Sequence, residues 1–199
     1  ARETVELPFG QKLIGGLSQP FDLPVGGEAT LTFFLTWHFP NRTEQGKQRG
    51  NFYATRFRSA ADVAEYVARN LDRLAGETRR WHETWYDSTL PHWLLDRLFS
   101  TASTLATSTC QWWANGRFWA WEGCRDASGC CFGSCTHVWN YAHAVAHLFP
   151  SLERGLREAE FNEGQNALGH QLYRLSLPLR PGLHDFLAAA DGQLGGIVK

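Results

Sequence analysis

The sequence contains no methionine, and its formal net charge is only −1 over 199 residues. This near-balance of charge leaves no basic stripe that could follow a phosphate backbone, so nucleic acid is not expected as a main partner. No stretch approaches the roughly 20 consecutive apolar residues that a transmembrane helix needs. Hydrophobic residues nevertheless make up 43% of the chain, which is enough for a substantial core and argues against global disorder.

Both ends of the sequence lack the features of natural termini. Ala1 is not an initiator methionine, and the residues after it do not form the apolar core of a signal peptide. The stretch 195–199 stops in apolar sequence without a polar tail. We therefore expect a segment of a longer protein, and the lack of a visible signal peptide favours a cytoplasmic location.

No Cys-x-x-Cys pair is present, and the five cysteines are an odd number. Four of them lie close together, at Cys124, Cys130, Cys131 and Cys135. This cluster is compatible with one or two disulfides, with a zinc site or with reduced thiols. The adjacent pair Cys130-Cys131 cannot easily supply two ligands to one tetrahedral metal, which disfavours zinc. A nucleophilic Cys124 or Cys135 would need a base held beside it, such as His137, and the spacing matches no cysteine hydrolase pattern.

The N-terminal region has the pattern of β structure. Alternation over residues 29–33 gives way to the apolar run 34–37, as in a strand buried on one or both faces. A few short strands cannot close a sheet by themselves, so we expect partner strands upstream of Ala1. Residues 43–51 are polar and contain glycine, which predicts a linker or a long surface loop.

From Ser59 the apolar period becomes helical. Ser59 and Asp62 form a variant of the capping box, and one apolar face follows at Val63, Val67, Leu71 and Leu74. Gly76 lies inside this helix or ends it. A second helical stretch breaks near 86–88, resumes after Pro91 and continues to Leu105.

The remaining residues predict loops and further helices. Residues 110–135 read as a loop with a short hairpin at Asn115-Gly116. A third helix is expected from His137 to Leu148 with Pro150 as its end, and another can start at Ser151. Residues 162–187 are irregular, and a last helix begins near Asp191. Strands first and helices afterwards indicate two domains.

The run 119–123, Trp-Ala-Trp-Glu-Gly, contains the leading candidate for chemistry. Aromatic walls suit the apolar faces of a sugar ring, and an acid at their rim suits chemistry on that ring. Glycoside hydrolysis needs two carboxyl groups, and Glu122 could supply one of them. On the residues alone, a loop carboxylate that caps a helix or faces solvent is favoured over a catalytic Glu122.

Other ionisable residues are weaker candidates. His143 and His147 share a helical face at the i, i+4 spacing, but no Glu lies between them in a His-Glu-x-x-His pattern. Half-buried structural histidines are therefore favoured over zinc ligands. Asp87 and Asp185, the latter beside His184, are interpreted as turn or cap residues.

Five stretches taken in order resemble glycoside hydrolase family 116, which includes non-lysosomal glucosylceramidase and prokaryotic β-glucosidases. They are residues 36–42, 50–54, 88–94, 118–123 and 137–150. The resemblance implies a mainly α fold with an N-terminal β segment. Residues 1–42 would be the end of a β-sandwich, 43–51 a linker, and 52–199 the truncated first part of an (α/α)6 barrel.

The resemblance also implies a retaining β-glycosidase that acts on a carbohydrate or glycoside substrate without a cofactor. Glu122 matches the family's nucleophile, whereas the acid/base Asp would lie beyond Lys199, so this segment alone should be inactive. Trp121 would pack on the sugar, with Thr136 and His137 near its hydroxyls and His184 in the family's His-Asp pair.

The sequence departs from the family at two places near the proposed nucleophile. His137 stands where better-known members carry a sugar-binding Asp, and the four-cysteine loop replaces a short polar stretch. Glucose specificity is therefore left open. The alternatives to an enzyme of this family are a non-catalytic carbohydrate-binding or scaffold protein on the same fold, and a zinc-dependent hydrolase that uses the Cys/His cluster.

Overall fold

The computed structural model describes most of the chain, and its residues fall into two compact units, Ala1–Phe33 and Phe34–Lys199. The described residues are 5–8, 10–123, 133–140, 143–175, 177, 179 and 189–199, without the side chains of Thr101, His137 and Asn140. The helices and strands found among them all lie in the second unit. None of these helices is long and apolar enough to cross a membrane.

The N-terminal segment is extended but forms no strand in residues 5–8 and 10–42. The strand expected over 29–37 is thus not formed, because a strand needs a neighbouring strand to pair its backbone groups. No described segment pairs with this one, and its large apolar side chains are exposed, as at Ile14 and Leu17, which are both 79% exposed. Short strands β1 (Thr43–Glu44) and β2 (Lys47–Gln48) form a hairpin instead. They lie within the predicted linker.

Two helices follow the predicted N-cap. The Ser59 hydroxyl accepts a hydrogen bond from the Asp62 amide at 3.1 Å and begins α1 (Ala60–Arg69). This confirms the capping motif. Helix α1 ends at Asn70, and α2 (Leu71–Tyr86) starts immediately afterwards. Gly76 lies inside α2 and does not end it.

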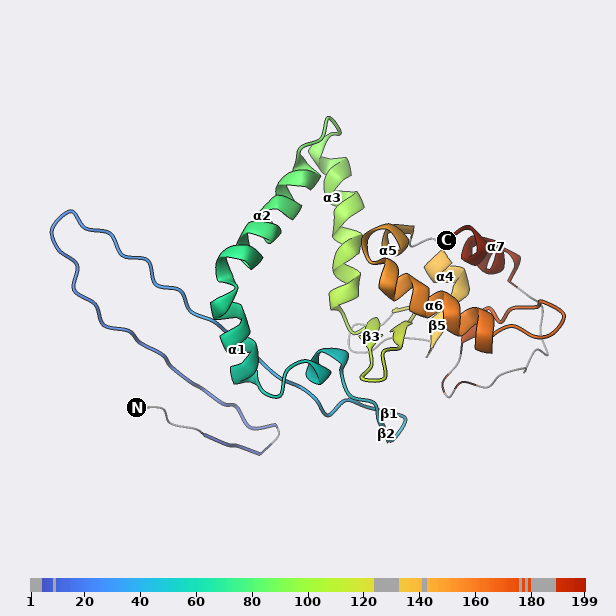
Figure 1. The fold of residues 1–199 in the computed structure, drawn as a ribbon, viewed down its shortest axis with the longest axis horizontal. Coiled ribbons are helices and arrows are strands. Elements are labelled where there is room, and N and C mark those ends of the chain that lie inside the picture. The colour runs from blue at the N-terminus through green and yellow to red at the C-terminus, as the bar shows by residue number, and fades with distance from the viewer. Residues whose placement is uncertain are drawn as a thin grey trace. The chain divides into compact units, whose positions relative to one another are not determined.

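Helix α3 (His92–Ser100) begins after Pro91, as predicted. Figure 1 shows α2 and α3 running antiparallel on either side of the turn at residues 87–91. The expected continuation to Leu105 is a tighter 3-10 helix, η2 (Thr101–Ala106), and an earlier 3-10 turn, η1, spans Phe52–Thr55. Short 3-10 segments of this kind are common at the ends of α-helices.

The predicted hairpin at Asn115-Gly116 is confirmed. Strands β3 (Cys110–Trp112) and β4 (Phe118–Ala120) pair antiparallel, with Cys110 opposite Ala120. The Trp113 amide donates to the Arg117 carbonyl at 2.9 Å. Gly116 supplies the positive φ of 85° that the turn requires.

A third antiparallel strand pair, formed by segments far apart in the sequence, and four helices complete the second unit. Strand β5 (Ser134–Cys135) pairs with β6 (Arg174–Leu175), so that Cys135 lies opposite Arg174. The helices are α4 (Thr136–Asn140), α5 (His143–Leu148), α6 (Pro150–Glu163) and α7 (Ala190–Val198). The helix before Pro150 stops at Leu148 as expected, but Pro150 itself is the first residue of α6. Proline suits that position because its missing N–H would have no helical partner there.

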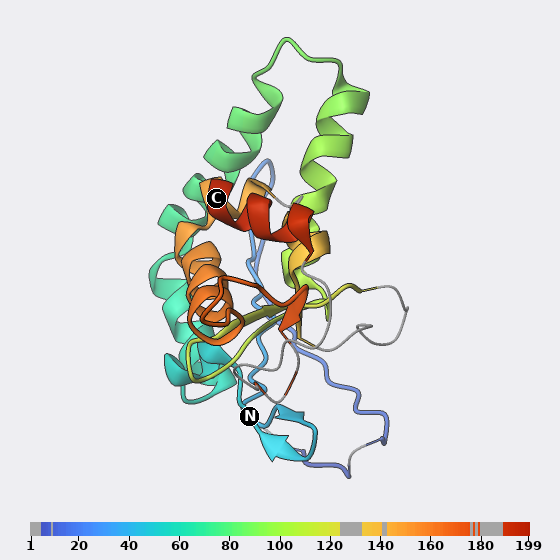
Figure 2. The same cartoon turned by 90° about the vertical axis from the view of Figure 1, so that its right-hand side faces the viewer.

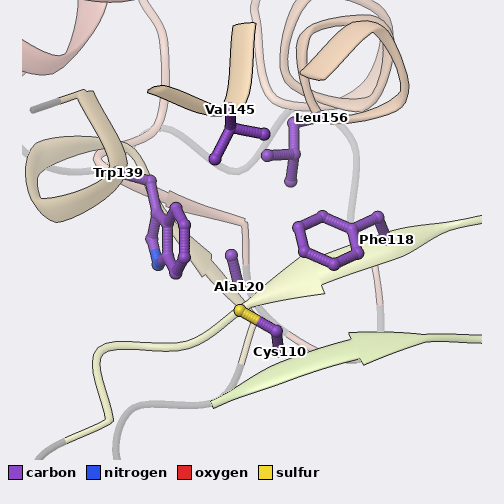
Figure 3. Close-up of a cluster of buried hydrophobic side chains, with 6 residues drawn as sticks. All are labelled: Cys110, Phe118, Ala120, Trp139, Val145 and Leu156. Carbon is purple, nitrogen blue, oxygen red and sulfur yellow. The ribbon is translucent and has the colours of Figure 1, made fainter. Parts of the chain in front are cut away.

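The core lies on both sides of β4. Alternate side chains of a strand point to opposite faces, and here each face has its own cluster. Figure 3 shows the first cluster, in which Phe118 and Ala120 face Trp139, Val145 and Leu156 with Cys110 beneath. The second cluster contains Trp113, Trp119, Trp121, Leu172 and Leu175.

The described residues therefore form a mixed fold of helices with small antiparallel sheets, in agreement with the coarser prediction of a mainly α chain with some β structure. The β structure differs in place from the prediction. Within the described residues it lies in the β1–β2 and β3–β4 hairpins and in the β5–β6 pair, and not in residues 5–8 and 10–42.

Candidate functional site

Glu122 follows β4 directly, and its carboxylate is held by an arginine from a distant part of the chain. Arg174 Nη2 lies 2.9 Å from Glu122 Oε2 in a charge-assisted hydrogen bond. The side chain of Glu122 is 36% exposed and that of Arg174 is 19% exposed. A charge-assisted pair at this distance fixes the direction of the carboxylate.

The backbone of Trp121, the residue before Glu122, is hydrogen-bonded through both its amide and its carbonyl. The Trp121 amide donates to the Thr109 carbonyl at 2.8 Å. The Trp121 carbonyl accepts a buried hydrogen bond from Trp139 Nε1 at 2.9 Å. The backbone on the N-terminal side of Glu122 therefore has little freedom to rotate.

Gly123 fixes the backbone on the other side of Glu122. Its φ of +71° lies in the left-handed region, where a side chain is disfavoured. A Cβ atom at this position would lie 2.7 Å from the Thr109 Cγ2 atom. Sequence position 123 thus combines two separate reasons for glycine, the backbone angle and the close approach of Thr109.

Glu122 lines a cleft of about 490 Å³. The walls come mainly from apolar residues of α3, η2, α4 and α5, among them Leu98, Leu105, Val138, Val145, Leu148 and Phe149. Thr104, Thr109 and His143 add polar groups. Among the described residues, no carboxylate other than Glu122 lines this cleft. A mainly apolar cleft with a few polar groups is the usual form of a small-molecule site.

The tryptophans around Glu122 are more buried than a sugar-stacking wall would be. Trp119 and Trp121 are 2% and 4% exposed, and both belong to the second core cluster. The ring centroids of Trp119 and Trp113 lie 5.2 Å apart. Trp121 also contributes to the lining of the cleft. These rings therefore pack in the core next to Glu122. A ligand in the cleft could contact only the part of Trp121 that lines it.

Of the other predicted substrate-binding residues, the structure describes the side chain of Thr136 alone. Thr136 is buried at the start of α4, where its hydroxyl donates to the Tyr173 carbonyl at 2.8 Å. That contact ties α4 to the segment preceding Arg174. The side chain of His137 and all of His184 and Asp185 lie outside the described residues.

The weaker candidates are placed as follows. His143 and His147 are both exposed on α5, and not half-buried as expected, with His143 at the cleft. Asp87 is the C-cap of α2, which confirms its interpretation as a cap residue.

Two of the cysteines are described, and both are free thiols. Cys110 is 9% exposed and Cys135 is 3% exposed. Burial raises the pKa of the Cys110 thiol to about 12, which keeps it protonated and unreactive. Cys124, Cys130 and Cys131 lie outside the described residues. Within the described part of the chain, no three His, Cys, Asp or Glu residues gather as a metal site would require.

Three residues that hold Glu122 were not assigned a role from the sequence. Thr109 and Arg174 carried no signal beyond a polar residue before a strand and a charge inside an otherwise apolar stretch. Trp139 lies in the expected helix 137–148, but its indole N–H could not be assigned a partner 18 residues away. No family model matches the chain, and no curated protein sequence matches it.

Proposed function

We propose that this chain contributes the nucleophile of a retaining β-glycosidase, and that Glu122 is that nucleophile. The observation that carries the proposal is that a carboxylate lines the cleft and that hydrogen bonds fix both its side chain and the backbone before it. Arg174 fixes the Glu122 side chain, while Thr109 and Trp139 fix the backbone of Trp121 before it. A nucleophile must be held close to the reacting atom, and pre-formed orientation of this kind supplies much of the rate of such reactions.

The chemistry follows the two-step scheme of retaining glycosidases. A Glu122 carboxylate oxygen forms a bond to the anomeric carbon while the bond from that carbon to the aglycone oxygen breaks. The departing oxygen takes a proton from a second carboxylic acid, which the resemblance to family 116 assigns to a residue beyond Lys199. That second group then takes a proton from water, and the water oxygen displaces Glu122 from the anomeric carbon.

The finer fold assignment belongs to the same proposal. We infer that residues 52–199 are the first part of an (α/α)6 barrel and residues 1–42 the end of a β-sandwich. The antiparallel pair α2 and α3 and the contact of α5 with α6 support the first assignment. Residues 5–8 and 10–39 form no strand in this structure, but their exposed apolar side chains support the second assignment, since the partner strands of a sandwich would bury them.

Substitution of Glu122 tests the proposal in the full-length protein. We expect Glu122→Gln to lower kcat/KM for an aryl β-glycoside on the order of 10⁴-fold or more, with the far-ultraviolet circular dichroism unchanged. Glu83→Gln, at an exposed site on α2, is the matched control and should retain the parent rate. Near-parental turnover by Glu122→Gln would disprove the assignment.

Covalent trapping separates an enzyme from a binding protein on the same fold. A 2-fluoro β-glycoside should add one fluorosugar to the protein, located by peptide mass spectrometry on Glu122. Saturable sugar binding without any covalent adduct would instead indicate the non-catalytic carbohydrate-binding protein. Stoichiometric zinc, with activity lost to a chelator, would indicate the zinc-dependent hydrolase.

A further inference from the structure

Four charged side chains are buried together behind the Glu122 site. Glu153, Arg157 and Glu160 lie on one face of α6 and are 4%, 9% and 1% exposed. The fourth is Lys199, whose side chain is 1% exposed. Removing charges from water is costly, and pairing with an opposite charge offsets part of that cost. When all four are ionised, two acids and two bases give this cluster a balanced charge.

The pairing within the cluster is uneven. Arg157 donates from Nη2 to Glu160 Oε1 at 3.0 Å, and its Nε lies 2.9 Å from Glu153 Oε1. The Nε contact is close but not aligned as a hydrogen bond. Lys199 Nζ lies 3.6 Å from Glu153 Oε2. Glu153 is therefore shared between Arg157 and Lys199, and Arg157 between Glu153 and Glu160.

Lys199 connects this cluster to the Glu122 site through Trp139. Its ammonium donates to the main-chain carbonyl of Trp139 in α4. The Trp139 indole in turn donates to the Trp121 carbonyl, one peptide before Glu122. Helix α7, which leads into Lys199, packs on α4 (Figure 2). Gly196 leaves room for the Arg157 guanidinium against α7, because a Cβ atom there would lie 2.7 Å from Arg157 Nη1.

We propose that Glu153, Arg157, Glu160 and Lys199 form a positioning cluster that sets the orientation of Glu122 through Trp139. None of the four lines the cleft, so they act on the backbone of the site and not on a ligand. The effect of the cluster on catalysis rests on the proposed function of Glu122. The hydrogen bond from Lys199 to Trp139 is independent of that function.

The state of Glu160 changes how the cluster holds Lys199. When Glu160 is ionised, Arg157 pairs mainly with Glu160, so Glu153 interacts more strongly with the Lys199 ammonium. When Glu160 is protonated, Arg157 pairs mainly with Glu153, and the ion pair between Glu153 and Lys199 weakens. Burial raises the pKa of Glu160 to about 7, with Arg157 opposing, so both forms occur near neutral pH.

Among the described residues, the ionisable groups that face Glu160 come from α6 and from the residue that follows α7. They are Arg157 and Glu153 on its own helix and Lys199 after α7. Helix α4 contributes the uncharged Trp139 carbonyl. His143 and His147 of the neighbouring α5 are exposed and stay the same in every variant below. A comparison of Glu160→Gln with the parent therefore isolates the contribution of Glu160.

The indole N–H of Trp139 reports on the cluster without any assay of activity. In nitrogen-15 NMR spectra of the full-length protein, its resonance is assigned by its loss in Trp139→Phe. We expect this resonance to move with pH with a midpoint near 7 in the parent. In Glu160→Gln it should stay at the acid-side position at every pH. The control Glu158→Gln, on the exposed side of α6, should behave as the parent.

Two results of the NMR titration would overturn the proposal. One is a Trp139 resonance that does not move between about pH 5.5 and pH 8.5 in the parent. The other is a resonance that moves equally in Glu160→Gln and in the parent. The parent titration needs no variant, so the proposal can be disproved even if a substitution prevents folding.

Kinetics test the positioning of Glu122. We expect Lys199→Met to lower kcat for an aryl β-glycoside about tenfold with KM changed less than about twofold, because misplacement of a reacting group slows the chemical step. Lys199→Arg should restore most of the loss. An unchanged kcat in Lys199→Met would reject the positioning cluster and leave Glu122 as nucleophile untouched. Parental activity in Glu122→Gln would reject the nucleophile but leave the NMR result standing.

Discussion

Arg174 and Glu122 form an ion pair of 2.9 Å although 52 residues separate them in the sequence. The pairing of β6 with β5 brings them together, since Arg174 lies opposite Cys135 in that ladder. Strand β5 also contacts β4, and the Ala120 amide donates to the Ser134 hydroxyl at 3.2 Å. The position of the guanidinium is thus set by backbone pairing, which is more rigid than a surface contact between two flexible side chains.

Arg174 should therefore matter for activity and not merely for stability. We expect Arg174→Ala to lower kcat/KM for an aryl β-glycoside about 100-fold, because a partner of a partly buried charge pair is lost. Arg174→Lys should recover part of the rate, since a lysine keeps the charge but not the fork of donors. Arg154→Ala, at an exposed site on α6, is the control. Equal rates for Arg174→Ala and the control would contradict the role of this pair.

The two reasons for glycine at position 123 can be separated by experiment. Gly116→Ala places a side chain at φ +85° in open space, whereas Gly123→Ala adds a clash with Thr109 at φ +71°. We expect Gly116→Ala to cost about 1 kcal/mol of unfolding free energy, from backbone strain alone. Gly123→Ala should cost about 2–4 kcal/mol, from strain and overpacking together. Urea unfolding of both variants measures the difference, and equal losses would exclude the clash.

Glu160 should make stability depend on pH in a defined direction. Its pKa is raised by burial from an ordinary 4.5 to about 7, so between these values the folded state binds more protons than the unfolded state. The stabilisation from protonated Glu160 is complete below pH 4.5 and is lost as the pH rises through 7. The loss is on the order of 3 kcal/mol.

We expect Glu160→Gln to remove this loss, because a glutamine does not titrate. The measurement is the urea midpoint near pH 5 and near pH 8, with Glu158→Gln as the control. The parent and the control should lose stability between the two conditions, and Glu160→Gln should lose less. A parental pH dependence in Glu160→Gln would show that other groups are responsible.

Cys110 should resist alkylation in the folded protein. Its thiol is buried against Trp139 and Ala120, and the raised pKa leaves almost no thiolate at neutral pH. We expect a maleimide to leave Cys110 unmodified in buffer and to modify it fully in urea, as read by peptide mass spectrometry. Rapid labelling of Cys110 in buffer would contradict the packing of the first core cluster.

Local signals in the sequence predicted the local structure well. Ser59 and Asp62 marked the start of α1, Pro91 the start of α3, and Asn115-Gly116 the turn of the β3–β4 hairpin. In each case the residue acts on its own neighbours, through a cap, a fixed φ or a turn geometry. Glu122 was likewise chosen as a candidate from its neighbours alone, the tryptophans and the glycine of residues 119–123, and the structure places it at the cleft.

The sequence could not predict what depends on distant partners. The strand pattern of residues 29–37 needs a neighbouring strand to become a ladder, and no described segment supplies one. Arg174 reaches Glu122 only through the β5–β6 pairing, and Lys199 reaches Trp139 only through the packing of α7. The burial of Trp119 and Trp121 likewise depends on Leu172 and Leu175, which are about 50 residues away.

Strand β4 belongs to both core clusters, because Phe118 and Ala120 face one and Trp119 and Trp121 face the other. The turn at Glu122 therefore cannot open by fraying one side of the protein. Because its opening would disturb both clusters, we expect it to open only when the second unit unfolds cooperatively. In hydrogen exchange the Trp121 amide, which donates to Thr109, should thus be among the slowest of the chain. A site that handles substrate at the surface would then be anchored in the last part of the protein to come apart.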